Sequence, residues 1–175
     1  MAQPKRPVLN IILIVIATFW GSQVSSQNYI YKGTQQIPST STWNFTTSGG
    51  ISGNISVTVA KSNTIGYLLL AIDVPMQEFS ISGSVYLILQ NGNMVTLNSR
   101  VAKDHVDDKS KVLFSISPAN YALLRKNDIM QIRFSIANSM MKTKENYTAK
   151  NERTAASIYD SPKYETAIEI DALKD

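Results

Sequence analysis

The residues with the most varied chemistry stand together in the stretch KDHVDD, residues 103–108. It holds the only histidine of the chain, His105, and three carboxylates, Asp104, Asp107 and Asp108. The carboxylates are candidate calcium ligands, although the glycine and the distal glutamate of a helix–loop–helix calcium site are missing. A histidine metal site or a catalytic triad would need partners for His105 from elsewhere in the fold. A solvated loop between two strands is the other interpretation, and we favour it.

Other catalytic patterns do not occur in the sequence. Serines are frequent, but none lies in the Gly-x-Ser-x-Gly pattern of a nucleophile elbow, and the glycines around Ser52 lack the lysine of a phosphate-binding loop. No pair of carboxylates follows an apolar strand as a glycosidase would require. The absence of cysteine excludes disulfides, thiol catalysis and cysteine metal sites. We therefore predict no catalytic residue and no cofactor.

Four aromatic residues are candidates for ligand binding, namely Tyr29, Tyr31, Trp43 and Phe45, in or just before the uncharged segment 33–60. Aromatic rings beside hydroxyl and amide groups suit a sugar-binding face, which combines stacking with neutral hydrogen bonds. Trp43 and Phe45 are two residues apart, so in a strand they would point the same way and could belong to the core. For this pair we favour the core.

The charge of the chain does not favour nucleic acid as a partner. The sequence has 17 basic and 13 acidic residues, and Lys5 and Arg6 are the only charges before residue 27, which leaves 15 − 13 = +2 for residues 27–175. The basic residues are scattered among acidic ones, whereas nucleic-acid binding needs a basic patch or stripe. We predict that most of them lie on a solvated surface.

The N-terminus has the features of a signal peptide. Lys5 and Arg6 precede a mostly apolar run, residues 8–20, and small polar residues follow it up to Ser26. A membrane-spanning helix needs about 20 apolar residues, so this run is short for an anchor. We expect residues 1–26 to be removed and the protein to be exported to the periplasm or the exterior. In the alternative, residues 8–20 remain as an uncleaved anchor and membrane is a partner.

Periodic apolar residues predict a β fold from residue 54 onward. Alternation predicts a strand over residues 54–60, and a continuous apolar run predicts a buried strand over residues 65–72. Asn91 and Gly92 separate two further strands and favour a type I′ hairpin turn. Residues 102–110 are highly charged and predict a loop before the next strand.

A helix and a core strand are predicted next, in the stretch SPANYALLRKNDIMQIRFSIA. Ser117 suits the N-cap, Pro118 suits the first helical position, and Asn127 suits a left-handed C-cap, so we expect a helix over residues 118–126. Apolar and polar residues alternate after it, which places Phe134 in the core and Arg133 in solvent.

The last part of the chain, residues 138–175, is polar and has little periodicity. Residues 147–149 could add an edge strand, on which Lys144 and Lys150 would discourage further pairing. Residues 168–172 alternate between apolar and acidic, which favours a strand or a loose tail.

The order of these features resembles the small exported β-sandwich proteins of unknown function found in Gram-negative bacteria. The resemblance covers residues 67–151 and rests on the hairpin with NG, the helix that starts at proline and carries LL, and the strand IMQIRFSI. It implies an antiparallel sandwich exported to the periplasm or beyond, with no assigned catalytic residues.

The sequence thus predicts a mainly β protein, an antiparallel β-sandwich in which residues 27–175 form one domain with one short helix. As function we expect a noncatalytic accessory or interaction protein of the cell envelope, with a protein or glycan partner. A carbohydrate-binding module is one alternative. A small hydrolase acting on envelope polymers is another, and it would need a pocket where Asp or Glu converges with His105.

Overall fold

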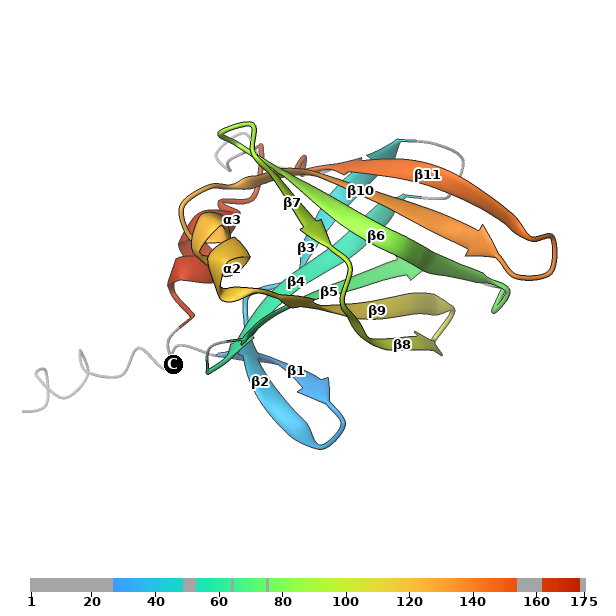
Figure 1. Cartoon of the computed structure of the whole chain (residues 1–175), viewed down its shortest axis with the longest axis horizontal. Coiled ribbons are helices and arrows are strands. Elements are labelled where there is room, and N and C mark those ends of the chain that lie inside the picture. The colour runs from blue at the N-terminus through green and yellow to red at the C-terminus, as the bar shows by residue number, and fades with distance from the viewer. Residues whose placement is uncertain (1–26, 49–52, 64, 75, 154–161, 174–175) are drawn as a thin grey trace, which may run out of the picture.

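The computed structural model describes residues 27–48, 53–63, 65–74, 76–153 and 162–173, which form eleven strands and two short helices (Figure 1). The predicted signal peptide, residues 1–26, lies outside the described residues. Within the described ranges no helix has the length and hydrophobicity that a membrane crossing needs. In chain order the elements are β1 (Asn28–Lys32), β2 (Gln35–Ser39), β3 (Trp43–Ser48), β4 (Asn54–Ser62), β5 (Ile65–Asp73), β6 (Phe79–Leu89), β7 (Met94–Leu97), β8 (Arg100–Val106), β9 (Lys109–Ile116), α2 (Pro118–Leu124), β10 (Ile129–Asn138), β11 (Thr143–Lys150) and α3 (Thr166–Asp171).

The strands form one antiparallel sheet that curls into a nearly closed barrel (Figure 1). The order from edge to edge is β7-β6-β10-β11-β3-β4-β5-β9-β8, and the β1–β2 hairpin branches off beside β4. The curl brings β6 over β9, where the backbone N–H of Ile81 donates to Ser110 Oγ at 3.2 Å. The prediction of a mainly β, antiparallel fold is confirmed, and the two packed layers are opposite sides of one curled sheet.

The interior of the barrel is filled by the inward side chains of this sheet. Trp43, Phe45 and Phe114 are among the largest fully buried residues, which confirms that the pair Trp43 and Phe45 belongs to the core. A second, smaller cluster lies on the outer side of the sheet and holds the β1–β2 hairpin; it consists of Ile30, Ile37, Ala60, Tyr67 and Leu113.

The predicted core strand is β10, and its two faces differ as the alternation indicates. Ile132, Phe134 and Ile136 are buried, whereas Arg133 is exposed. The strands predicted at residues 54–60 and 65–72 are confirmed as β4 and β5.

The predicted helix forms as α2, which ends two residues earlier than expected. Ser117 Oγ accepts a hydrogen bond from the backbone N–H of Asn120 at 3.3 Å, and Pro118 takes the first turn. The prediction of a left-handed C-cap at Asn127 was wrong, because Arg125 is the C-cap and has ordinary helical dihedrals. Asn127 contributes with its side chain instead, since its Nδ2 donates to the carbonyl of Leu123 at 3.0 Å.

The prediction of a type I′ turn at Asn91 and Gly92 was also wrong. The last strand pair before the loop is Ile88 with Met94, which leaves more residues than a two-residue turn can hold. Gly92 alone has a positive φ, +83°, and its N–H donates to the carbonyl of Leu89 at 2.9 Å. The loop is a type I turn followed by a bulge glycine, which the longer connection requires.

The charged loop predicted over residues 102–110 is a hairpin of β8 and β9. Its tip is Asp107 and Asp108, whose φ angles of +52° and +57° are those of a type I′ turn. Lys103 and Asp104 pair with Val112 and Lys111 across the hairpin. Almost all of β8 is exposed, so it has no apolar alternation from which the sequence could have revealed it.

The chain after residue 138 is more ordered than its composition indicates. The strand predicted at residues 147–149 is longer, and it lies between β10 and β3, so it is not an edge. Residues 168–172 form part of α3, so the predicted strand or loose tail was wrong. Thr166, Ile170 and Leu173 are the buried residues there, at the spacing of one helix face.

The segment that carries α3 is held to one end of the barrel by Asn151, which is 3% exposed. Its Nδ2 donates to the carbonyls of Ile129 and Tyr164, and its Oδ1 accepts from the N–H of Tyr164, all at 2.8–2.9 Å. Glu169 of α3 accepts from Trp43 Nε1 at 2.9 Å. The carboxyl-terminal segment therefore closes this end of the barrel through bonds to buried groups.

We predict that Asn151→Ala lowers the free energy of unfolding by about 3 kcal/mol, because it leaves several buried backbone groups without partners. Chemical denaturation measures this change. Asn98→Ala is the control, since Asn98 is exposed, and it should stay within about 0.5 kcal/mol of the wild type. Equal midpoints for the two variants would contradict the role given to Asn151.

Candidate functional site

The structure does not gather the metal and catalytic candidates of residues 104–108 into a site. Asp104 Oδ1 accepts a hydrogen bond from the N–H of its neighbour His105, and Asp107 and Asp108 form the hairpin tip. Both ring nitrogens of His105 are inaccessible and have no hydrogen-bond partner. In the part of the chain that the structure describes, no group of three or more His, Asp or Glu is placed to hold a metal ion.

The four aromatic candidates are separated as well. Trp43 and Phe45 are in the core, while Tyr29 and Tyr31 are 47% and 66% exposed on the β1–β2 hairpin. The hydroxyl of Tyr31 accepts a hydrogen bond from Gln36 Nε2 at 2.8 Å. A hollow of about 280 Å³ lies between this hairpin and β8. The hairpin thus offers two tyrosines, but not the four-ring face that the sequence allowed.

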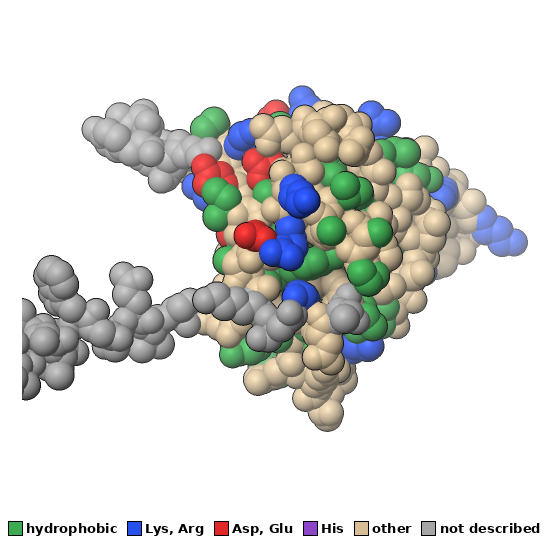
Figure 2. Space-filling view, turned by 60° about the vertical axis from the view of Figure 1, so that its left-hand side comes forward, with side chains coloured by type: hydrophobic (Ala, Val, Ile, Leu, Met, Phe, Trp, Pro, Cys, Tyr) green, Lys and Arg blue, Asp and Glu red, His purple; other side chains and the backbone are tan. Residues whose placement is uncertain are grey.

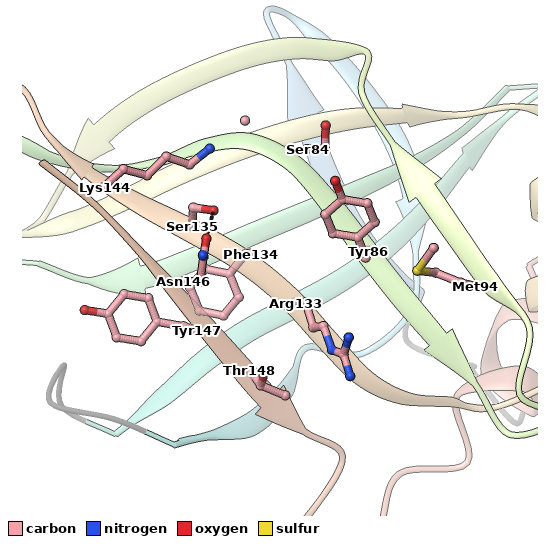
Figure 3. Close-up of a pocket in the computed structure, with 11 residues that line it drawn as sticks. Ser84, Tyr86, Met94, Arg133, Phe134, Ser135, Lys144, Asn146, Tyr147 and Thr148 are labelled. Carbon is pink, nitrogen blue, oxygen red and sulfur yellow. Dashed lines mark hydrogen bonds between the residues drawn. The ribbon is translucent and has the colours of Figure 1, made fainter.

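A larger hollow lies elsewhere, on the outer side of β6, β10 and β11 (Figure 3). Its volume is about 570 Å³. Strand register sets Tyr86, Arg133 and Thr148 side by side across these three strands. We call this surface the concave face; it is lined by Gly83, Ser84, Tyr86, Met94, Arg133, Phe134, Ser135, Lys144, Asn146, Tyr147 and Thr148.

A bulge in β6 shapes the concave face. Between two pairings with β10, β6 advances four residues, from Tyr86 to Ser82, while β10 advances two, from Arg133 to Ser135. Gly83 lies in the bulge with φ +75°, a conformation that other residues adopt only with strain. A Cβ on Gly83 would stand 2.9 Å from Lys144 Nζ, so glycine also leaves room for this lysine.

The polar groups of the concave face are mainly hydrogen-bond donors. Arg133 and Lys144 line it without any Asp or Glu, and neither has an ion pair or hydrogen bond with another described residue. Ser135 is buried, and its hydroxyl donates a 2.7 Å hydrogen bond to Asn146 Oδ1. That bond orients the amide of Asn146 and leaves its Nδ2 group to donate into the hollow.

Several basic residues elsewhere on the surface differ from these two, because acidic partners lie next to them. Arg125 is 2.6 Å from Asp171 at the end with the helices, and Lys109 is 2.8 Å from Asp73. Figure 2 shows acidic and basic side chains mixed on the face that it presents. The concave face therefore has a local excess of positive charge that the small net charge of the chain does not reveal.

Two residues of the lining, Phe134 and Tyr147, are buried and also belong to the core on the inner side of these strands. Tyr147 stacks on Phe134, with ring centroids 5.8 Å apart, and its hydroxyl donates to Glu145 Oε2. This hydrogen bond, burial and the negative charge of Glu145 raise the pKa of Tyr147 to about 12. The aromatic pair fixes the backbone from which Arg133 and Asn146 point outward.

The sequence offered no signal that joins the residues of the concave face. The sequence predicts that Arg133 faces solvent, that Tyr86 belongs to a hairpin strand, and that Lys144 discourages further pairing of an edge strand. Their proximity comes from the pairing of β10 with β6 and β11, which a single sequence does not reveal. Comparison with protein-family models, with curated proteins and with solved structures finds no match for this chain.

We predict that Tyr147 ionises near pH 12, later than the ordinary tyrosine value of about 10. The folded state holds this proton more tightly than the unfolded state, so the resulting stability is complete below about pH 10 and is lost as the pH rises to about 12. Ultraviolet titration of phenolate absorbance in the wild type and in Tyr147→Phe isolates this residue. Glu145→Gln should lower its pKa, and an unchanged late titration in that variant would refute the assigned cause.

Proposed function

We propose that this chain is an exported, noncatalytic accessory protein of the cell envelope that binds a glycan on its concave face. The observation that carries the proposal is the concave face itself, where one half-exposed tyrosine, two unpaired cations and several hydroxyl and amide groups surround a hollow of about 570 Å³. Sugars are bound by this combination, because a ring face stacks on the pyranose while polar groups bond its hydroxyls.

Several features favour a binding role over the hydrolase alternative. That alternative requires a carboxylate that bonds to the ring of His105, and both ring nitrogens lack a hydrogen-bond partner among the described residues. The concave face has no carboxylate of its own with which to protonate a leaving group. Its lining comes from the strands β6, β7, β10 and β11, whose pairing holds the backbone in place, as a preorganised binding surface requires.

Export supports a role in the envelope, because a glycan-rich surface is the environment that an exported protein of this kind meets. The positive residues Lys5 and Arg6, the apolar run 8–20 and the small residues before Gln27 carry this part of the proposal. A protein without cysteine folds there without help from disulfide formation.

If export occurs as proposed, the mature protein recovered from the cell envelope or medium begins at or near Gln27, because the signal peptidase removes the leader. Fractionation of Gram-negative cells expressing the full chain, followed by N-terminal sequencing, measures this. A double change of Lys5 and Arg6 to Gln should slow export. A protein that stays in the cytoplasm with Met1 in place would refute the export part alone.

For the binding site, we predict that Tyr86→Ala weakens glycan binding about twofold to tenfold, since an aromatic contact contributes about 0.5–1.5 kcal/mol. Isothermal titration calorimetry against a panel of neutral and acidic oligosaccharides gives the affinities. Tyr31→Ala is the matched control, because Tyr31 is an exposed tyrosine on the distant hairpin. Binding that depends on Tyr31 and not on Tyr86 would move the site away from the concave face.

A further inference from the structure

Building on the proposed glycan-binding function, we propose that the ligand is an acidic polysaccharide and that Arg133 and Lys144 bind two different anionic groups along its chain. The ligand class is thus a glycan that bears carboxylate or sulfate groups at intervals.

The spacing of the two cations indicates a chain and not a small anion. Arg133 is paired with Thr148, and Lys144 precedes Thr148 by four residues on β11. Four residues of an antiparallel strand extend about 13 Å, so the two side chains leave the sheet at well-separated points. Figure 3 shows Lys144 and Arg133 at opposite ends of the hollow, with Ser135 and Asn146 between them. Two anionic groups on one chain therefore match the two separated cations better than one carboxylate or sulfate does.

The charge of the lining indicates that the ligand is acidic. Both cations lack partners among the described residues, and no Asp or Glu lines the hollow to oppose them. The guanidinium of Arg133 has the planar fork that binds a carboxylate or sulfate through two hydrogen bonds, while Lys144 offers a point charge on a flexible stem. The hollow itself reduces the exposure of a bound ion pair to water, which strengthens the attraction.

The groups between the cations favour a sugar backbone over an acidic peptide or a nucleic acid. Asn146 Nδ2 and the hydroxyls of Ser84 and Thr148 suit the hydroxyl groups of a polysaccharide. β10, which carries Arg133 and Ser135, is paired on both sides, so a peptide cannot add to it as a further strand. Single-stranded nucleic acid needs a row of stacking rings, and Tyr86 is the one exposed aromatic ring in this lining.

The test measures binding of the purified protein to defined chains by calorimetry. The probes are oligogalacturonates of one to six units, the same oligomers with their carboxylates reduced to alcohols, and sulfated oligosaccharides of matched length. Polyglutamate and a single-stranded oligonucleotide of similar charge represent the two other polymer classes. We expect acidic oligomers of several units to bind at least tenfold more tightly than the monomer and than the reduced chain.

Variants assign the effect to the two residues. Arg133→Gln and Lys144→Gln should each weaken binding of the acidic chain about tenfold, which corresponds to one charge-assisted hydrogen bond, and should leave the weak binding of the reduced chain unchanged. Lys126→Gln is the control, because it removes the same charge from an exposed residue at the end of α2. The thermal midpoints of all three variants should match the wild type, since each residue is exposed.

The possible results separate this inference from the proposed function. Equal affinity for acidic and reduced chains would overturn the acidic ligand and leave glycan binding in place. Binding of the monomer as tight as that of the chain would overturn the two-point contact. Tight binding of polyglutamate or the oligonucleotide alone, or a loss as large in Lys126→Gln as in Arg133→Gln, would also overturn the inference. Failure to bind any glycan, acidic or neutral, would overturn the proposed function as well.

Discussion

The curled sheet depends on closing one of its ends, and the buried amide of Asn151 provides the main tie. If the end of the barrel were open, water would reach the rings of Trp43 and Phe45 and the backbone groups near them. The fold would then lose the stabilisation that comes from burying these groups. Asn151 joins the start of β10 to Tyr164, while Glu169 satisfies the indole N–H of Trp43. These hydrogen bonds are directional, so they attach the carboxyl-terminal segment to the barrel and also determine its position there.

The core and the proposed binding surface meet in β10, which contributes alternate residues to each. Its inward residues, such as Phe134, pack in the core, and its outward residues, such as Arg133, line the concave face. Because side chains alternate strictly along a strand, a change of ligand preference on the outer side need not disturb the core. The bulge at Gly83 is the exception, since it bends β6 and sets the shape of both sides at once.

The sequence was sufficient for elements whose periodicity reflects burial. β10 alternates because one face is in the core, and α2 carries its own start signal in Ser117 and Pro118, so both could be predicted. The exposed strand β8 has almost no buried residue and was taken for a loop. Residues 168–172 alternate by chance over too short a span, and the helical spacing of Thr166, Ile170 and Leu173 was overlooked. The concave face could not be predicted, because Tyr86, Arg133 and Lys144 become neighbours only through strand pairing and a bulge.

The concave face holds two cations, Arg133 and Lys144, in a lining that contains no Asp or Glu. Exposed ion pairs such as that of Arg125 with Asp171 contribute little to stability. Folding therefore does not decide whether an exposed basic residue has an acidic partner. Two exposed cations in a hollow that no Asp or Glu lines repel each other weakly. Their arrangement fits the acidic ligand that we propose. Because that ligand would supply the missing negative charge, its binding should be strongest at low ionic strength and should decline as salt screens the two contacts.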